Sequence, residues 1–284
     1  MIAKVGDTKL QRGALSAARP AAVEPASPHR RAVEYVIETV AGRLEQRFSL
    51  EELASLVFFS PYHFHRIFRQ VTGVPPGRFF AAFRIEAAKR LLLISDLTVA
   101  EVGLEVGYRS SGTFGSQFAR LVGVSPRTFR ELARANGSFA AEAALREPPP
   151  SSRAMLAVTG RLELEGGGRR RTVAVSLFPT PLAEGRPVAS TLAAAPGRFE
   201  LYADRAGSFY AVAVTVDPAA GPRRLLLHGA DARVAWSRDP TRVRRAAPAR
   251  ALDLVLRPRR LVDPPILVPP ALLALSPAPS GRAA

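Results

Sequence analysis

The chain has 284 residues, with 40 Lys and Arg against 24 Asp and Glu, and therefore a formal charge of +16 at pH 7. This positive excess favours a polyanionic partner, and the length favours two domains that each bury their own core. The chain has no cysteine, which excludes disulfides, thiolate catalysis and cysteine metal sites and suits a reducing cytoplasm.

The first segment, residues 1–28, is rich in Ala and Pro with scattered charges, and it lacks the apolar block of a secretory signal. This composition predicts a flexible arm rather than a packed element. Residues 29–136, which follow, have the apolar spacing of helices and are expected to form an all-α domain.

Within this region, the segments Ser60–Phe80 and Ser110–Arg130 repeat each other at an offset of fifty residues. Each carries apolar residues at helical spacing and then Gly-Val with proline just beyond, which is typical of a helix end. A capping box precedes each copy and marks the start of a short helix, over 50–57 and over 99–106. Each copy is therefore expected to complete a helix-turn-helix unit.

One face of the helix that begins at Pro61 has an unusual composition. If Phe64 points to the core, Tyr62, Arg66 and Arg69 point away from it and His65 flanks them. Arginine can pair with guanine, and tyrosine or histidine can reach thymine methyls or phosphates, so this face suits a DNA major groove. The alternative is that both helical hairpins are only the core of a small α-helical domain.

At these residues the sequence resembles the DNA-binding domain of AraC/XylS-type transcriptional regulators, over about residues 31–135. Several separate motifs carry the resemblance in order: Phe59–Arg69, Arg84–Leu92, Val102–Tyr108, Phe114, Phe118 and Gly-Val-Ser-Pro at 123–126. It implies a seven-helix domain whose two helix-turn-helix units are joined by a long helix, here 76–94. It also implies that both recognition helices enter successive major-groove segments of one duplex.

By this resemblance, the base-reading positions of the family fall on Tyr62, His65, Arg66, Ser111, Gly112 and Ser116. Arg69 is added as a base-contact residue because it also points away from the core on the helix that begins at Pro61. The positions in the second helix are short side chains, so we expect the first unit to supply most of the base specificity. Backbone phosphates are expected to be contacted by Ser60, Arg109 and Arg120. The chain also departs from the family at Phe58, a turn position where glycine is common.

Residues 137–152 contain a run of three prolines and are expected to be a linker. Beyond it, short alternating runs separated by Gly and Pro predict an antiparallel β-sandwich over 153–262. The runs are Leu156–Leu164, Thr172–Phe178, Val188–Leu192, Phe199–Ala203, Phe209–Val216, Arg223–Leu227 and Leu252–Leu256. Part of this region, 155–217, is weakly similar to the carboxypeptidase regulatory-like, transthyretin-like sandwich. The tail, 263–284, is apolar but too interrupted by proline to span a membrane.

The charge is unevenly divided, with a net of +5 over residues 29–135 and +10 over residues 151–260. We expect a cytoplasmic transcriptional regulator that binds double-stranded DNA, with RNA polymerase as a further partner and no membrane association. The C-terminal domain is expected to bind a small-molecule effector or to self-associate. A weakly specific architectural DNA-binding protein is the alternative.

No enzyme is expected, because no nucleophile elbow, phosphate-binding glycine loop or paired carboxylates are found. His63 and His65 are two residues apart on different helix faces, which does not suit a metal clamp. Neither a metal nor a cofactor is therefore expected.

Overall fold

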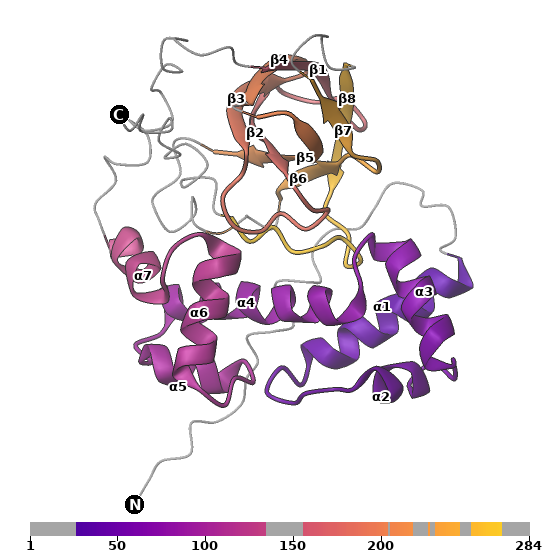
Figure 1. Ribbon diagram of the computed structural model, residues 1–284, viewed down its shortest axis with the longest axis vertical. Coiled ribbons are helices and arrows are strands. Elements are labelled where there is room, and N and C mark those ends of the chain that lie inside the picture. Colours follow the sequence, from indigo (N-terminus) through magenta and orange to yellow (C-terminus); the bar gives the residue numbers. More distant parts are fainter. Residues whose placement is uncertain are drawn as a thin grey trace, which may run out of the picture.

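The computed structural model describes residues 27–134, 156–203, 205–217, 227, 231–244 and 251–268. The expected linker and almost all of the expected N-terminal arm lie outside these residues. The described chain has a helical part and a sheet-rich part, and helix α4 crosses the middle of the helical part beneath the strands (Figure 1).

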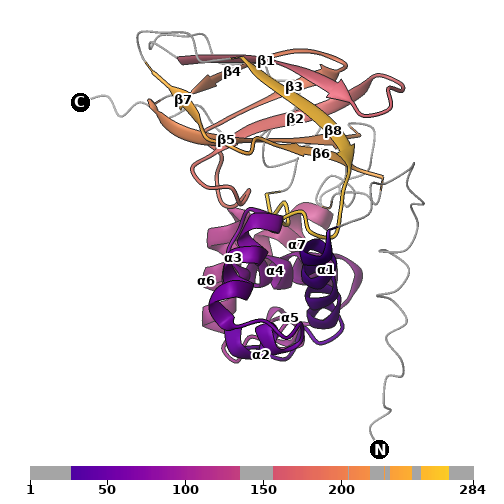
Figure 2. The ribbon, with the colours of Figure 1, turned by 90° about the vertical axis from the view of Figure 1, so that its right-hand side faces the viewer.

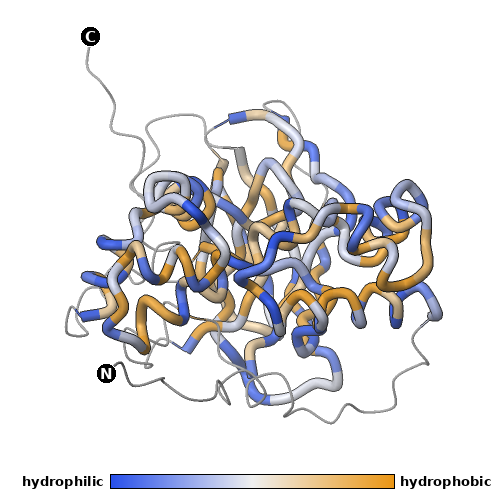
Figure 3. Tube along the Cα trace, turned by 90° about the horizontal axis from the view of Figure 1, so that it is seen from below, coloured by the Kyte–Doolittle hydropathy of each residue, from blue (hydrophilic) through white to orange (hydrophobic). Residues whose placement is uncertain are grey.

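Seven helices make up the helical part. They are α1 (Pro28–Ala41), α2 (Leu50–Ser55), α3 (Pro61–Thr72), α4 (Pro76–Ile94), α5 (Val99–Glu105), α6 (Ser111–Val122) and α7 (Pro126–Arg134). The long connecting helix has the bounds that the sequence predicts. Seen from below, hydrophobic and hydrophilic stretches alternate along the helical trace, as amphipathic helices require (Figure 3).

The two short helices begin at capping boxes, as predicted. The Ser49 hydroxyl accepts from the backbone N–H of Glu52 at 3.1 Å, and the Glu52 carboxylate accepts from the N–H of Ser49 at 2.7 Å. The corresponding distances between Thr98 and Glu101 are 3.2 and 2.7 Å. These reciprocal bonds satisfy amides that the helix leaves without partners, and so fix where each helix-turn-helix unit starts.

Helices α3 and α6 end in the same way. Gly73 after α3 and Gly123 after α6 have φ of 78° and 94°, and their N–H groups donate to the carbonyls of Arg69 and Ala119 at 2.8 and 2.9 Å. Only glycine adopts this left-handed conformation without strain, which is why the glycine in each repeat terminates a helix.

The apolar stripes of the repeats form the core of the helical part. Phe64 and Phe68 are fully buried on α3, and Phe114 and Phe118 are fully buried on α6. The ring centroids are 5.5 Å apart in the first pair and 5.7 Å apart in the second. The repeat in the sequence is therefore a repeat in the packing.

The turns of the two units differ. In the first unit the N–H of Phe59 donates to the carbonyl of Ala54, and in the second the N–H of Tyr108 donates to that of Gly103. The second unit then has one more residue, Arg109, before the cap of its second helix, α6. Phe58 has φ of 57° and is 97% exposed, so a phenylalanine occupies a conformation that favours glycine.

Eight strands form the sheet-rich part. They are β1 (Leu156–Leu164), β2 (Arg171–Phe178), β3 (Ala189–Ala195), β4 (Gly197–Ala203), β5 (Gly207–Val216), β6 (Arg233–Trp236), β7 (Thr241–Val243) and β8 (Leu252–Pro258). They pair in the order β3-β2-β5-β6-β8-β1-β4, with β7 on β5, and the sheet curls nearly into a barrel (Figure 1).

The expectation of a wholly antiparallel sheet is wrong at one pair, because β1 and β8 run parallel. This parallel pair joins the first and the last strand of the sheet-rich part. The alternation of residues within one strand does not indicate which strand it pairs with or in which direction. The four-residue β6 and three-residue β7 were not predicted, since such short runs show no period. The expected strand 223–227 lies outside the described residues except Leu227, which is not in a strand.

The sheet-rich part lies against one side of the helical part (Figure 2), and residues that follow β8 contact α4. The Glu86 carboxylate accepts two hydrogen bonds from Arg259, at 2.6 and 2.9 Å. The buried Lys89 ammonium donates to the carbonyl of Leu267 at 2.9 Å. The N–H of Leu267 in turn donates to Ala183 at 3.1 Å, so the segment after β8 is held between the loop that follows β2 and the long helix.

Candidate nucleic-acid interface

Helix α3 exposes a polar face that combines one aromatic ring with arginines. Tyr62 is 81% exposed, and Arg66 and Arg69 are exposed, while His65 is half-buried beside them. The opposite side of the helix carries Phe64, which is fully buried. These residues therefore have the outward direction expected from the sequence, and their contact with DNA stays a prediction.

A cluster of rings lies beside Arg66, and the sequence reasoning missed it. The Arg66 guanidinium donates from Nη2 to Nδ1 of His63 at 3.3 Å. The His63 ring packs edge-on against Phe59 and His29, with centroid distances of 4.8 and 5.9 Å. Because the imidazole accepts this bond, it restricts the arginine before any ligand is present. Their i, i+3 spacing on a helix was the signal available in the sequence.

Helix α6 exposes a face with almost no side chains. Ser111, Gly112 and Ser116 are exposed, and the Ser116 hydroxyl donates to the carbonyl of Gly112 at 2.9 Å. A Cβ built on Gly115 would meet no atom within 4 Å. This face can approach another molecule closely but offers few groups that read a base edge.

The residues expected at the DNA backbone have different surroundings. The Ser60 hydroxyl accepts from the N–H of His63 at 3.3 Å as the cap of α3, and Arg109 is exposed in the turn before α6. Arg120 donates to the Gln117 side chain at 2.9 and 3.2 Å, and its Nη1 lies 3.7 Å from the Glu184 carboxylate. The structure therefore turns Arg120 toward the sheet-rich part.

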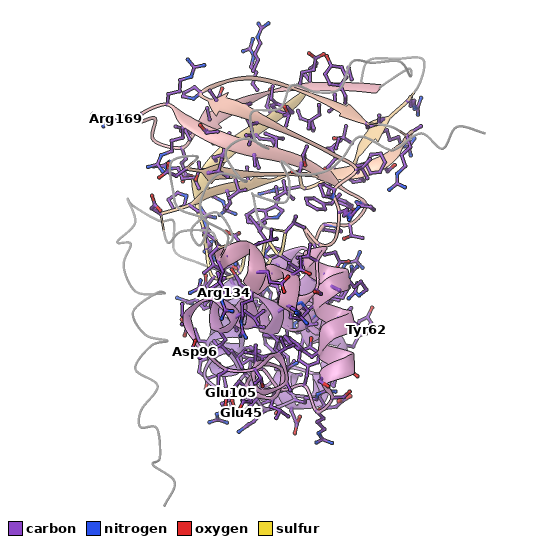
Figure 4. All side chains as sticks on the ribbon, turned by 90° about the vertical axis from the view of Figure 1, so that its left-hand side faces the viewer. Glu45, Tyr62, Asp96, Glu105, Arg134 and Arg169 are labelled. Atoms are coloured by element: carbon purple, nitrogen blue, oxygen red, sulfur yellow. The ribbon has the colours of Figure 1, made fainter. Side chains whose placement is uncertain are left out.

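Helices α3 and α6 lie on one side of the helical part, and α1 and α7 lie on the other (Figure 2). Tyr62 points outward on the first side, while Glu45 and Glu105 lie at the end farthest from the strands and Asp96 lies away from Tyr62 (Figure 4). The three labelled carboxylates thus lie away from the face that carries Tyr62 (Figure 4).

Residues 53–132 match the family model described as Helix-turn-helix domain. The MmsAB operon regulatory protein of Pseudomonas aeruginosa is 38% identical over 100 residues, which are 35% of this chain and 31% of that protein. These residues form an AraC-type helix-turn-helix DNA-binding domain.

Other relatives match the same AraC-type domain. The bifunctional transcriptional activator/DNA repair enzyme AdaA of Bacillus subtilis is 25% identical over 107 residues, 38% of this chain and 51% of that protein. The crystal structure of the DNA-binding domain of AdpA in complex with a target DNA has 34% identity and a TM-score of 0.35, and the match covers 39% of this chain and 96% of that one. The chain thus matches between about a third and a half of the two named curated relatives.

Within the described residues, no three His, Asp or Glu side chains gather as they would around a metal ion. The described helices also include none with the length and apolar character needed to cross a membrane.

Proposed function

We propose that this protein is a sequence-specific, DNA-binding transcriptional regulator that reads the major groove mainly with α3. The observation that carries the proposal is the contrast between two related faces. Tyr62, Arg66 and Arg69 project from α3, and the positions fifty residues later, Gly112, Ser116 and Ala119, project almost nothing.

The chemistry of the α3 face suits direct readout. A guanidinium can donate two parallel hydrogen bonds to O6 and N7 of guanine, and a tyrosine or histidine can contact a thymine methyl or a phosphate. Arg66 is the strongest base-reading residue in the proposal, because His63 already restricts it at 3.3 Å. Less conformational entropy is then lost on binding.

Helix α6 has a different part in the proposal. Its small side chains let the backbone approach the duplex, with Ser111 and Arg109 contacting phosphates beside it. The Ser116 hydroxyl proton is engaged by the carbonyl of Gly112, so that hydroxyl is left mainly as an acceptor. The second unit then sets register and affinity more than sequence preference.

The sheet-rich part is where we place regulation, through a small-molecule effector or self-association. It contacts α4, the helix that joins the two recognition units, through Glu86 and Lys89. A change in that contact would alter how the two units are set on a duplex. Sedimentation of the full chain over a range of concentrations tests self-association, which a concentration-independent monomer would exclude.

Selection of bound sequences from a random duplex pool tests the proposed function. We expect an extended site in which one half is strongly preferred, and Arg66→Ala should cost about 1–3 kcal/mol there and relax one base position. Ser116→Ala should produce a small loss that is nearly the same for all sequences. Arg31→Ala, which removes an exposed charge from α1, is the control.

Two outcomes would overturn the proposal. A specificity ratio near one at physiological salt would favour the architectural alternative. Equal losses on selected and random duplexes for Arg66→Ala would remove the base-reading role of that residue.

A further inference from the structure

A cleft of about 320 Å³ opens between α4, α6 and the loop from β2 to β3. The cleft is lined by four arginines, Arg47, Arg78, Arg84 and Arg120. One carboxylate, that of Glu184, also lines it. Its volume lies at the small end of the range of ligand pockets, about 300–1,000 Å³. Four cations around so small a space favour an anionic occupant.

Two of the arginines are held by backbone carbonyls rather than by acids. Arg84 donates to the carbonyls of Leu44 and Gln46 at 3.1 and 2.6 Å, and Arg47 donates from Nε to that of Gly107 at 3.3 Å. Burial, opposed by Tyr108 and reinforced by Arg47, holds the pKa of Arg84 below its ordinary value. Carbonyl partners leave the charge of both guanidiniums uncompensated.

Gly107 makes this arrangement possible. Its φ is 82°, and a Cβ at this position would lie 2.7 Å from the carbonyl oxygen of Leu44. The loop that carries Arg47 can therefore lie directly against the turn of the second unit. The position of Arg47 at the cleft depends on this close approach.

Glu184 occupies the side of the cleft that belongs to the sheet-rich part. One carboxylate oxygen accepts from Arg78, and the other is buried without a hydrogen bond, 3.7 Å from Nη1 of Arg120. The N–H of the next residue, Gly185, donates to the carbonyl of Leu121 at 2.7 Å. The loop is thus fixed to the end of α6 with its carboxylate among the arginines.

The cleft adjoins the recognition face of α6. Thr113, Gln117 and Arg120 line the cleft from one side of this helix, and at 100° per residue Gly112 and Ser116 lie on the neighbouring side. Because α4 joins the two recognition units, the cleft lies between them. A phosphate strand that borders the groove entered by α6 would pass its mouth.

We propose that this cleft binds a phosphate group, with the Glu184 carboxylate as a competitor built into the protein. Arginine forks match phosphate oxygens with paired hydrogen bonds. A phosphate that enters would take over Arg78 and Arg120 from Glu184. The source is either a phosphodiester of bound DNA, which rests on the proposed function, or a free phosphate, which does not.

Two variants of the full chain, whose DNA affinities should change in opposite directions, test whether the phosphate belongs to DNA. Arg47→Gln should weaken binding of selected and random duplexes about equally, by roughly 3- to 10-fold, and lower the salt slope by about one. Glu184→Gln should strengthen binding of both by a similar factor, since the competing charge is gone. Arg90→Gln, on the opposite side of α4 and exposed, should change affinity less than 2-fold, roughly the effect of a remote surface charge.

Inorganic phosphate tests the other source. Thermal unfolding in phosphate and in chloride at equal ionic strength should give a saturable rise in Tm that Arg47→Gln abolishes and Glu184→Gln enhances. If the variants change DNA affinity as expected but phosphate does not raise Tm, the cleft binds a phosphodiester of DNA. If phosphate raises Tm but the protein does not bind DNA specifically, the cleft binds a free phosphate, and this result stands even if the proposed function fails. No effect of either variant in both assays, or weaker DNA binding by Glu184→Gln at unchanged Tm, would overturn the inference.

Discussion

The ion pair between Glu86 of α4 and Arg259 after β8 should be a main source of cohesion between the two parts of the chain. Their side chains are only 12% and 24% exposed, and the two bonds measure 2.6 and 2.9 Å. Burial by itself raises the pKa of Glu86, but the charge and hydrogen bonds of Arg259, together with the charges of Lys89 and Arg90, outweigh burial and lower the pKa from 4.5 to about 2. A lowering of that size corresponds to about 3 kcal/mol of stability at neutral pH.

Glu86→Gln should therefore reduce the free energy of unfolding at pH 7 by about 3 kcal/mol, since it leaves a buried guanidinium without its counter-charge. The folded pKa lies below the unfolded one, so this contribution is complete above pH 4.5 and is lost as the pH falls toward 2. Wild type and variant should then converge in acid. Urea denaturation at a series of pH values measures both effects.

The matched control is Glu131→Gln on α7. Glu131 also pairs with an arginine, Arg127 at 3.0 Å, but as an exposed helical i, i+4 pair, and its loss should cost less than about 1 kcal/mol. If Glu86→Gln costs no more than this control and keeps the pH dependence of the wild type, the assigned stabilisation is wrong.

Three further predictions concern single positions. Burial lowers the pKa of Lys89 to about 8 from 10.5, so stability should rise with pH between about 8 and 10.5, and Lys89→Met should remove that rise in denaturation curves. Gly115→Ala should raise the free energy of unfolding by about 1 kcal/mol through helix propensity, because its Cβ meets open space, and the rise shows as a higher Tm. Gly103→Ala, whose Cβ would lie 3.1 Å from the Phe114 ring, should stabilise less or destabilise. Phe58→Gly should stabilise the chain by about 1 kcal/mol by relieving a φ of 57°, and an unchanged or lower Tm would contradict this.

Local signals were enough to predict the helical part of the chain. Each of these signals involves residues that are close together in the sequence. They are the caps at Ser49 and Thr98, the glycines at 73 and 123 and the phenylalanine stripes. Each is a short-range interaction whose partners are neighbours in the sequence. The same signals predicted which side of α3 is exposed, because a helix face follows from its period.

The sheet was predictable only in part. Alternation located the longer strands, but the parallel pairing of β1 with β8 joins residues about ninety apart, such as Gly160 and Leu252. The prediction also missed β6 and β7, whose formation depends on the strands beside them. Sheet order is decided by partners that lie far away in the chain.

The sequence by itself determined the two helix-turn-helix units and the outward arginines of the first, because caps, helix ends and amphipathic faces are local. Only the tertiary structure decided that Arg120 turns toward Glu184 and that α4 is tied to Arg259. These two contacts join residues more than sixty positions apart. They exist only because folding brings together charges that lie far apart in the sequence, where their attraction is strong at short range.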